Sequence, residues 1–242
     1  MIEYFPYHRK LLKKKEVKEL LNHFDQTLLH VGTMSGGDNE TTRQIKQAYN
    51  GYFEDPSANK IIYDALDRDS GFCWRTIAQT TERPMLSKSK LGQFYHPHQD
   101  SPILGDYSTS IVLNDDFEGG ELQLRVAGEV KNYKFKPGEA VTYPTGMDHC
   151  VRPVTKGERK AIVIWTKSSV TDPLLREIAC LSNKAYHILA KEKDRRKENP
   201  YLFEDGIEQA SNDPLWLVDK IFSLIGRADG SQWYSRNNGY DQ

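Results

Sequence analysis

Cysteine is scarce in this chain. Only Cys73, Cys150 and Cys180 occur among 242 residues. They are odd in number, widely spaced and without a Cys-x-x-Cys pair, which argues against a disulfide framework and against a thiolate metal site. Residues 1–6 also lack the charged and apolar regions of a signal peptide. We therefore expect a reducing compartment, the cytoplasm.

Long apolar runs and an excess of charge are also missing. No stretch approaches the roughly 18 apolar residues of a membrane span, so no membrane partner is expected. The 33 Lys and Arg balance 34 Asp and Glu, a formal net charge of -1. A nucleic-acid partner is therefore not indicated, although a local basic groove stays open. The length suits one large domain, or a core with appended elements.

Hydrophobic patterning divides the chain into three zones. In residues 1–84, a support region, apolar spacing predicts a helix over residues 11–29 and weaker helices over 41–49 and 61–66. The aromatic and β-branched run Phe72–Ala78 predicts a strand. In residues 171–242 an amphipathic pattern predicts a helix from Leu174 to Leu189. Asp213 and Pro214 indicate the start of another helix, ending near residue 225.

The middle zone, residues 85–170, has a different pattern. Short apolar runs alternate with Gly, Pro, Asn and Asp, as in a β-sandwich or barrel, a class that includes jelly rolls. The expected strands are residues 92–98, 109–113, 121–126, 130–135, 140–143, 149–154 and 159–165. The predicted fold class is α+β: a jelly-roll core with N-terminal and C-terminal helices.

A metal motif lies in this zone. His98 and Asp100 are two residues apart, so on a strand their side chains leave the same face, and a distant strand can supply His149. Two imidazoles and one carboxylate form the facial triad that binds non-haem Fe(II) and leaves positions open for oxygen chemistry. His96 is the nearest rival ligand, but only the spacing of His98 and Asp100 supplies a carboxylate.

Arg159 and Tyr95 are candidate residues for a dicarboxylate cosubstrate. Residues 155–158 resemble a turn, which predicts a hairpin of residues 149–154 and 159–165. With a three-residue loop, Arg159 shares a face with His149, roughly 13 Å away at about 3.3 Å per residue. A two-residue loop would turn it to the other face. Tyr95 would face away from His98 in a regular strand, but Pro97 argues against regularity there.

Three segments together carry a family resemblance: Tyr95–Asp100, Leu113–Leu122 and His149–Arg159. They resemble the 2-oxoglutarate and Fe(II)-dependent dioxygenases, in the prolyl-4-hydroxylase-like group and its PKHD-type branch. The resemblance implies a double-stranded β-helix. It also implies iron ligands at His98, Asp100 and His149, and a 2-oxoglutarate anchor at Arg159. Collagen-type prolyl hydroxylases usually have lysine at the anchor, so arginine argues against a proline substrate. Halogenating relatives lack the carboxylate of Asp100.

The implied activity is hydroxylation of a protein residue or a small molecule. Fe(II), 2-oxoglutarate and O2 would be required, with ascorbate as reductant and with succinate and CO2 as coproducts. Three alternatives stay open. The same chemistry could act on nucleic acid, the pocket could serve a non-catalytic sensor of 2-oxoglutarate and metal, or Mn or Zn could support another reaction.

Overall fold

The computed structural model describes residues 5–31, 48–195, 218 and 221, and of residues 187–195 only the backbone. These residues belong to two compact units. The first comprises residues up to 72 together with 80–167, and the second comprises 73–79 together with residues from 168 onward. The division expected at residues 84/85 and 170/171 stays a prediction. None of the described helices is long and apolar enough to cross a membrane.

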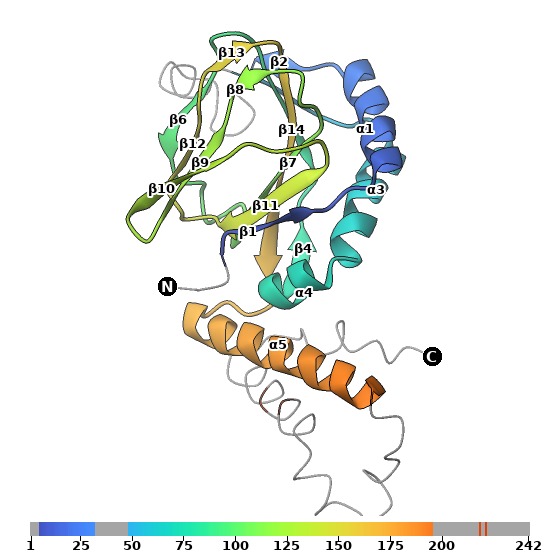
Figure 1. Cartoon of the computed structure of the whole chain (residues 1–242), viewed down its shortest axis with the longest axis vertical. Helices are drawn as coiled ribbons and strands as arrows, with labels where there is room; N and C mark the ends of the chain where they lie inside the picture. Colours follow the sequence, from blue (N-terminus) through green and yellow to red (C-terminus); the bar gives the residue numbers. More distant parts are fainter. Residues whose placement is uncertain (1–4, 32–47, 196–217, 219–220, 222–242) are drawn as a thin grey trace, which may run out of the picture. The chain divides into compact units, whose positions relative to one another are not determined.

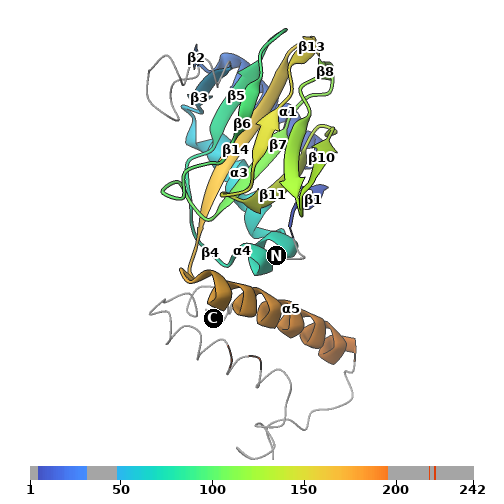
Figure 2. The same cartoon turned by 90° about the vertical axis from the view of Figure 1, so that its left-hand side faces the viewer.

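The first unit is built on two antiparallel sheets that face each other (Figure 2). The large sheet has the order β1 (Tyr7–Lys10), β11 (Glu139–Pro144), β7 (Tyr107–Val112), β14 (Arg159–Ser168), β5 (Met85–Ser89), β3 (Tyr49–Tyr52) and β2 (His30–Val31), with β4 (Ala78–Thr81) also paired to β14. The small sheet has the order β10 (Glu129–Tyr133), β9 (Leu122–Val126), β12 (His149–Val151) and β6 (Tyr95–His98). A separate pair joins β13 (Val154–Lys156) to β8 (Glu118–Gly119).

Alternation along the strands creates the core between the two sheets, because successive side chains of a strand point to opposite faces. The large sheet contributes Val112, Val141, Tyr143 and Ala161, and the small sheet contributes Leu122, Leu124 and Val151. All of them are buried. The predicted α+β class and the double-stranded β-helix are confirmed.

Two helices cover the other face of the large sheet (Figure 1). Helix α1 (Lys14–Gln26) buries Val17, Leu20 and Phe24, and α3 (Pro56–Asp67) buries Ala58, Ile62, Ala65 and Leu66. Their charged faces are left to solvent, as expected of amphipathic helices. Both helices overlap segments predicted to be helical.

The run Phe72–Ala78, predicted as a strand, is mostly helix. Helix α4 spans Ser70–Thr76. The carboxylate of Asp69 accepts a 3.2 Å hydrogen bond from the backbone N–H of Phe72 in its first turn. Because β-propensity depends strongly on context, this local capping outweighs the aromatic and β-branched composition of the run.

The predicted hairpin of residues 149–154 and 159–165 is also wrong. Strand β12 pairs with β6 and β9 in the small sheet, while β14 pairs with β5 and β7 in the large sheet. Between them, β13 pairs with β8. The chain therefore crosses from one sheet to the other after His149, and Arg159 approaches the site from the opposite sheet.

The second unit contains α5 (Pro173–Arg195), which confirms the helix expected from Leu174. The Asp172 side chain accepts a 2.8 Å hydrogen bond from the N–H of Leu175 and so caps the first turn. Cys180 is buried, and its thiol donates to the carbonyl of Arg75. The helix expected over residues 214–225 lies outside the described residues, apart from Val218 and Ile221. Of the helix expected over 41–49, residues 41–47 lie outside them, while Tyr49 begins a strand.

Candidate active site

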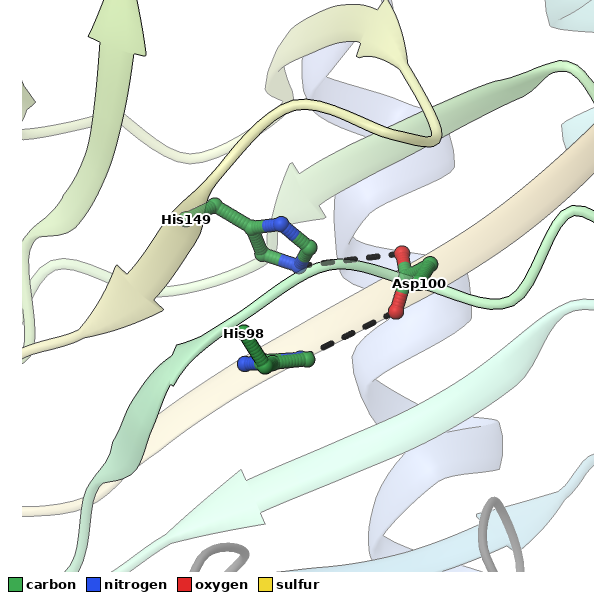
Figure 3. Close-up of side chains that lie close together, drawn as sticks. All are labelled: His98, Asp100 and His149. Carbon is green, nitrogen blue, oxygen red and sulfur yellow. Dashed lines mark ion pairs between the residues drawn. The ribbon is translucent and has the colours of Figure 1, made fainter.

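The three predicted ligands point toward one another (Figure 3). His98 ends β6, and His149 begins the neighbouring strand β12 directly opposite it. Asp100 follows two residues after His98. Its two oxygens lie 3.7 Å from Nε2 of His98 and 3.6 Å from Nε2 of His149. Two atoms each about 2.1 Å from a shared ion lie about 3 to 4 Å apart, so these three side chains can hold one metal.

Backbone contacts orient both imidazoles in the same way. Nδ1 of His98 lies 2.7 Å from the carbonyl oxygen of His96, and Nδ1 of His149 lies 2.9 Å from that of Met147. A carbonyl only accepts, so each Nδ1 carries a proton, which leaves Nε2, facing the carboxylate, as the ring nitrogen that can bind a metal. This is the tautomer that a metal ligand needs.

The carboxylate of Asp100 is held by two donors from the large sheet. Its Oδ2 accepts a 2.7 Å hydrogen bond from Ser108 and a 3.0 Å hydrogen bond from the indole of Trp165. Ser108 and Trp165 are direct partners in the pairing of β7 with β14. The sequence analysis missed both residues. The signal for Trp165 was its even spacing from Arg159, which places the two side chains on one face of β14.

Arg159 is buried in the same pocket as the three ligands. It is only 2% exposed, and its Nε and Nη2 atoms have no hydrogen-bond partner among the described residues. The pKa of Arg159 is lowered to about 10. Burial is the main cause, and electrostatic interaction with Tyr95 and Tyr143 partly opposes it. A buried guanidinium without a partner is costly, so this arrangement indicates a site for an anion.

Gly120 makes room for Arg159. Its φ is +65°, and a Cβ atom there would lie 3.1 Å from Cδ of Arg159 and 3.2 Å from the Phe117 ring. A larger residue would therefore be strained in its backbone and crowded against the arginine. This explains physically why glycine follows Glu118-Gly119 at this point of the chain.

The pocket between the sheets encloses about 490 Å³ of empty space, part of it open to solvent. Asp100 and Arg159 both line it. The remaining lining residues are mostly apolar, aromatic or small: Met85, Ser87, Tyr95, His98, Ser110, Leu122, Tyr143, His149, Val151, Val163 and Trp165. The pocket thus combines a possible metal site and an unpartnered cation with an otherwise uncharged wall.

An irregularity in β6 brings Tyr95 into this pocket. Tyr95 pairs with Val151 and His98 pairs with His149, so three steps on β6 match two on β12. Such a bulge reverses the side-chain alternation, and Tyr95 and His98 face the same side, with ring centroids 6.2 Å apart. His96 is exposed and stacks edge-on against Phe94. The structure therefore brings Tyr95, but not His96, to the site.

Tyr143 was not predicted from the sequence. Its ring lies 5.1 Å from the ring of His149, and its side chain is 2% exposed. Its hydroxyl makes no hydrogen bond to any residue that the structure describes. Burial and the Asp100 carboxylate raise its pKa well above the ordinary value, so the phenol remains a neutral donor.

Comparisons with known proteins agree with this geometry. Residues 84–167 match the 2OG-Fe(II) oxygenase superfamily. A PKHD-type hydroxylase of Maricaulis maris is 30% identical over 179 residues, which cover 69% of this chain and 81% of that protein. The chain belongs to the 2OG-Fe(II) oxygenase superfamily, in its PKHD-type branch. A second PKHD-type hydroxylase, from a Synechococcus strain, is 27% identical over 69% of this chain and 80% of its own length.

Two solved structures have a similar fold. A Trichoplax adhaerens prolyl hydroxylase, solved with a hypoxia inducible factor peptide, covers 67% of this chain and 83% of its own, with a TM-score of 0.57 and 17% identity. A Pseudomonas putida prolyl-4-hydroxylase covers 67% and 91%, with a TM-score of 0.51 and 18% identity. They support the fold.

The residues present fit the groups that the superfamily implies, Fe(II) with 2-oxoglutarate and O2. Two imidazoles and one carboxylate meet at one point, which suits Fe(II) and leaves coordination positions open. In the same pocket the unpartnered guanidinium of Arg159 suits a carboxylate.

Proposed function

We propose that this oxygenase is a Fe(II)- and 2-oxoglutarate-dependent dioxygenase that hydroxylates a protein residue or a small molecule, with succinate and CO2 as coproducts. His98, Asp100 and His149 would hold the iron. Arg159, assisted by Tyr95, would bind the distal carboxylate of 2-oxoglutarate. The observation that carries this proposal is the buried, unpartnered guanidinium of Arg159 in the pocket that the three ligands share.

Each protein group has a definite task in this scheme. Bound Fe(II) would supply oxygen activation coupled to decarboxylation of the oxo acid. The guanidinium of Arg159 would grip the distal carboxylate through two parallel hydrogen bonds. This contact would orient the molecule in the pocket that His98 and His149 also line. The apolar side chains of Leu122, Val151 and Val163 in the pocket wall would limit the access of water to the reacting atoms.

The first test is uncoupled turnover. Protein freed of metal would be supplied with Fe(II), 2-oxoglutarate and ascorbate, which we include as the proposed reductant, and succinate would be measured without a substrate. We expect succinate with iron and none with Mn or Zn. Metal-dependent binding of 2-oxoglutarate without any succinate would instead indicate a sensor.

The second test identifies the substrate. Protein extracts, metabolite pools and oligonucleotides would be incubated with the loaded enzyme, and mass spectrometry would score the gain of one oxygen atom coupled to succinate. We expect the gain in a protein or metabolite. A gain confined to oligonucleotides would contradict this and indicate nucleic-acid oxidation.

The proposed compartment is the cytoplasm. It is supported by the cysteines, since the chain has only three, widely spaced and without a Cys-x-x-Cys pair. Recovery of the native protein from a fractionated cell tests this proposal.

A further inference from the structure

Asn50 is a fully buried polar residue next to the pocket, and it lies outside the matched segment 84–167. It is in β3, directly opposite Ser87 of β5. Directly paired residues project from the same face of a sheet, and Ser87 lines the pocket. Strand β3, which precedes the matched segment, therefore directs one amide toward the pocket.

The orientation of this amide is fixed by the backbone. Nδ2 of Asn50 donates a 3.1 Å hydrogen bond to the carbonyl oxygen of Leu86. The flipped amide would place two oxygens against each other, which is unfavourable. As a result, the positions of the donor Nδ2 and the acceptor Oδ1 of Asn50 are both defined.

The hydroxyl of Tyr95 faces both ends of that amide. Its oxygen lies 3.2 Å from Nδ2 and 3.2 Å from Oδ1 of Asn50, while Oγ of Ser87 is farther, at 3.5 Å. The hydroxyl can donate to Oδ1, or it can accept from Nδ2 and point its own proton elsewhere. Changing between the two states requires rotation of one proton and no movement of heavy atoms.

This choice matters because Tyr95 and Arg159 line the same pocket. When no carboxylate is present, the phenol is satisfied by Oδ1 of Asn50. When a carboxylate binds Arg159, the phenol can donate to it while Nδ2 of Asn50 donates to the phenol. An aspartate at position 50 would only accept, so it would keep the phenol proton and also repel the ligand.

The geometry points to Asn50 as a positioning residue that sets the dicarboxylate specificity of the site by acting through Tyr95. This inference rests on the proposed function, since it assumes that a 2-oxo diacid occupies the pocket. Asn50 itself touches neither the metal ligands nor Arg159 in any hydrogen bond of the described residues.

The experiment compares two acids that differ at one end. Affinities of the full chain for 2-oxoglutarate and for 2-oxobutyrate, which lacks the distal carboxylate, would be measured by calorimetry with Mn(II) in place of iron. The variants are Asn50→Leu, Asn50→Asp, Tyr95→Phe and the double variant Asn50→Leu with Tyr95→Phe. Asn59→Leu on α3, away from the pocket, is the matched control.

We expect Asn50→Leu and Tyr95→Phe each to weaken 2-oxoglutarate binding about tenfold, the size expected for a hydrogen bond to a charged group. Asn50→Asp is expected to weaken it further. Binding of 2-oxobutyrate should stay within about twofold in all of them. The double variant should match Tyr95→Phe alone, because both changes break one chain of hydrogen bonds.

Three outcomes would overturn the inference. Equal loss for both acids would show that Asn50 only supports the sheet. A full additional loss in the double variant would show that Asn50 acts independently of Tyr95. If Asn50→Leu does not fold, unchanged 2-oxoglutarate binding in Asn50→Asp or in Tyr95→Phe refutes it. Failure of the wild-type protein to prefer 2-oxoglutarate would instead count against the proposed function.

Discussion

The indole nitrogen of Trp165 donates a 3.0 Å hydrogen bond to Oδ2 of Asp100, although 65 positions separate the two residues in the chain. Trp165 therefore orients one of the three proposed metal ligands. Replacement by phenylalanine keeps most of the packing and removes the donor. We predict that Trp165→Phe weakens Mn(II) binding to the metal-free protein by about tenfold or more, the usual effect of losing a group that orients a ligand.

A matched control is available in the second unit. Trp74 is also buried, at 8% exposure, and lies outside the pocket. Trp74→Phe should bind Mn(II) as the wild-type protein does. If Trp165→Phe also binds normally, Ser108 alone is enough to orient Asp100, and Ser108→Ala should then produce the loss.

Replacing Arg159 is expected to have opposite effects on the stability of the ligand-free protein and on its binding of 2-oxoglutarate. Its buried Nε and Nη2 atoms lack partners, so the ligand-free protein bears the cost of an unsatisfied charge. We predict that Arg159→Met raises the free energy of unfolding of the ligand-free protein by about 1–3 kcal/mol. The same change should weaken 2-oxoglutarate binding about a hundredfold. Denaturant unfolding and calorimetry would measure the two effects.

The control for Arg159→Met is Arg152→Met, which alters an exposed arginine outside the pocket. It should change neither quantity. A drop in the stability of ligand-free Arg159→Met would mean that water satisfies the guanidinium. The unpartnered arginine would then no longer indicate an anion site in the pocket.

Asp55 caps helix α3, and we expect its contribution to the stability of the protein to depend on pH. Its carboxylate accepts a 2.8 Å hydrogen bond from the N–H of Ser57, and this contact lowers the pKa of Asp55 below its ordinary value of 3.8. A lowered folded-state pKa gives stability that is complete above the unfolded-state pKa and is lost as pH falls through the folded-state pKa. Asp55→Ala should therefore lower the melting temperature at pH 7, and the difference should shrink below about pH 3.8.

Asp64→Ala provides the comparison for Asp55→Ala. Asp64 forms an exposed ion pair with Lys60 on the same helix, and such pairs contribute little. Its effect on the melting temperature at pH 7 should be the smaller of the two. A difference for Asp55→Ala that persists unchanged at low pH would show that the carboxylate does not cap the helix.

The metal motif could be predicted from the sequence because its key spacing is local. His98 and Asp100 are two residues apart, and short strands between turn residues indicated a sandwich that could bring His149 to them. The position of Arg159 was harder. The turn at residues 155–158 suggested a hairpin, but β14 pairs with β5 and β7 instead. The arginine reaches the pocket from the facing sheet, which local turn chemistry cannot indicate.

The residues that the sequence did not reveal all depend on pairing between distant strands. Ser108 and Trp165 become neighbours only when β7 pairs with β14, and Asn50 reaches Tyr95 only when β3 pairs with β5. The inward position of Tyr95 depends on a bulge, whose extra residue reverses the alternation. Register of this kind is determined by the whole sheet, so no single segment contains it.

Tyr143 leads to the last prediction. Its hydroxyl has no hydrogen-bond partner among the described residues, and its ring lies 5.1 Å from the ring of His149. We infer that the hydroxyl lies nearer the metal end of the pocket, where the oxo-acid end of the cosubstrate would bind. Tyr143→Phe should therefore weaken the binding of 2-oxoglutarate and of 2-oxobutyrate by the same factor, about fivefold, as expected for the loss of one neutral hydrogen bond.

This pattern differs from the one expected at Asn50 and Tyr95, where only the diacid loses affinity. The same Mn(II) calorimetry distinguishes the two ends of the pocket, because 2-oxobutyrate reports on the metal end alone. A loss restricted to 2-oxoglutarate would place the Tyr143 hydroxyl at the distal carboxylate beside Arg159. No loss for either acid would mean that the phenol serves only to pack against the His149 ring, 5.1 Å away.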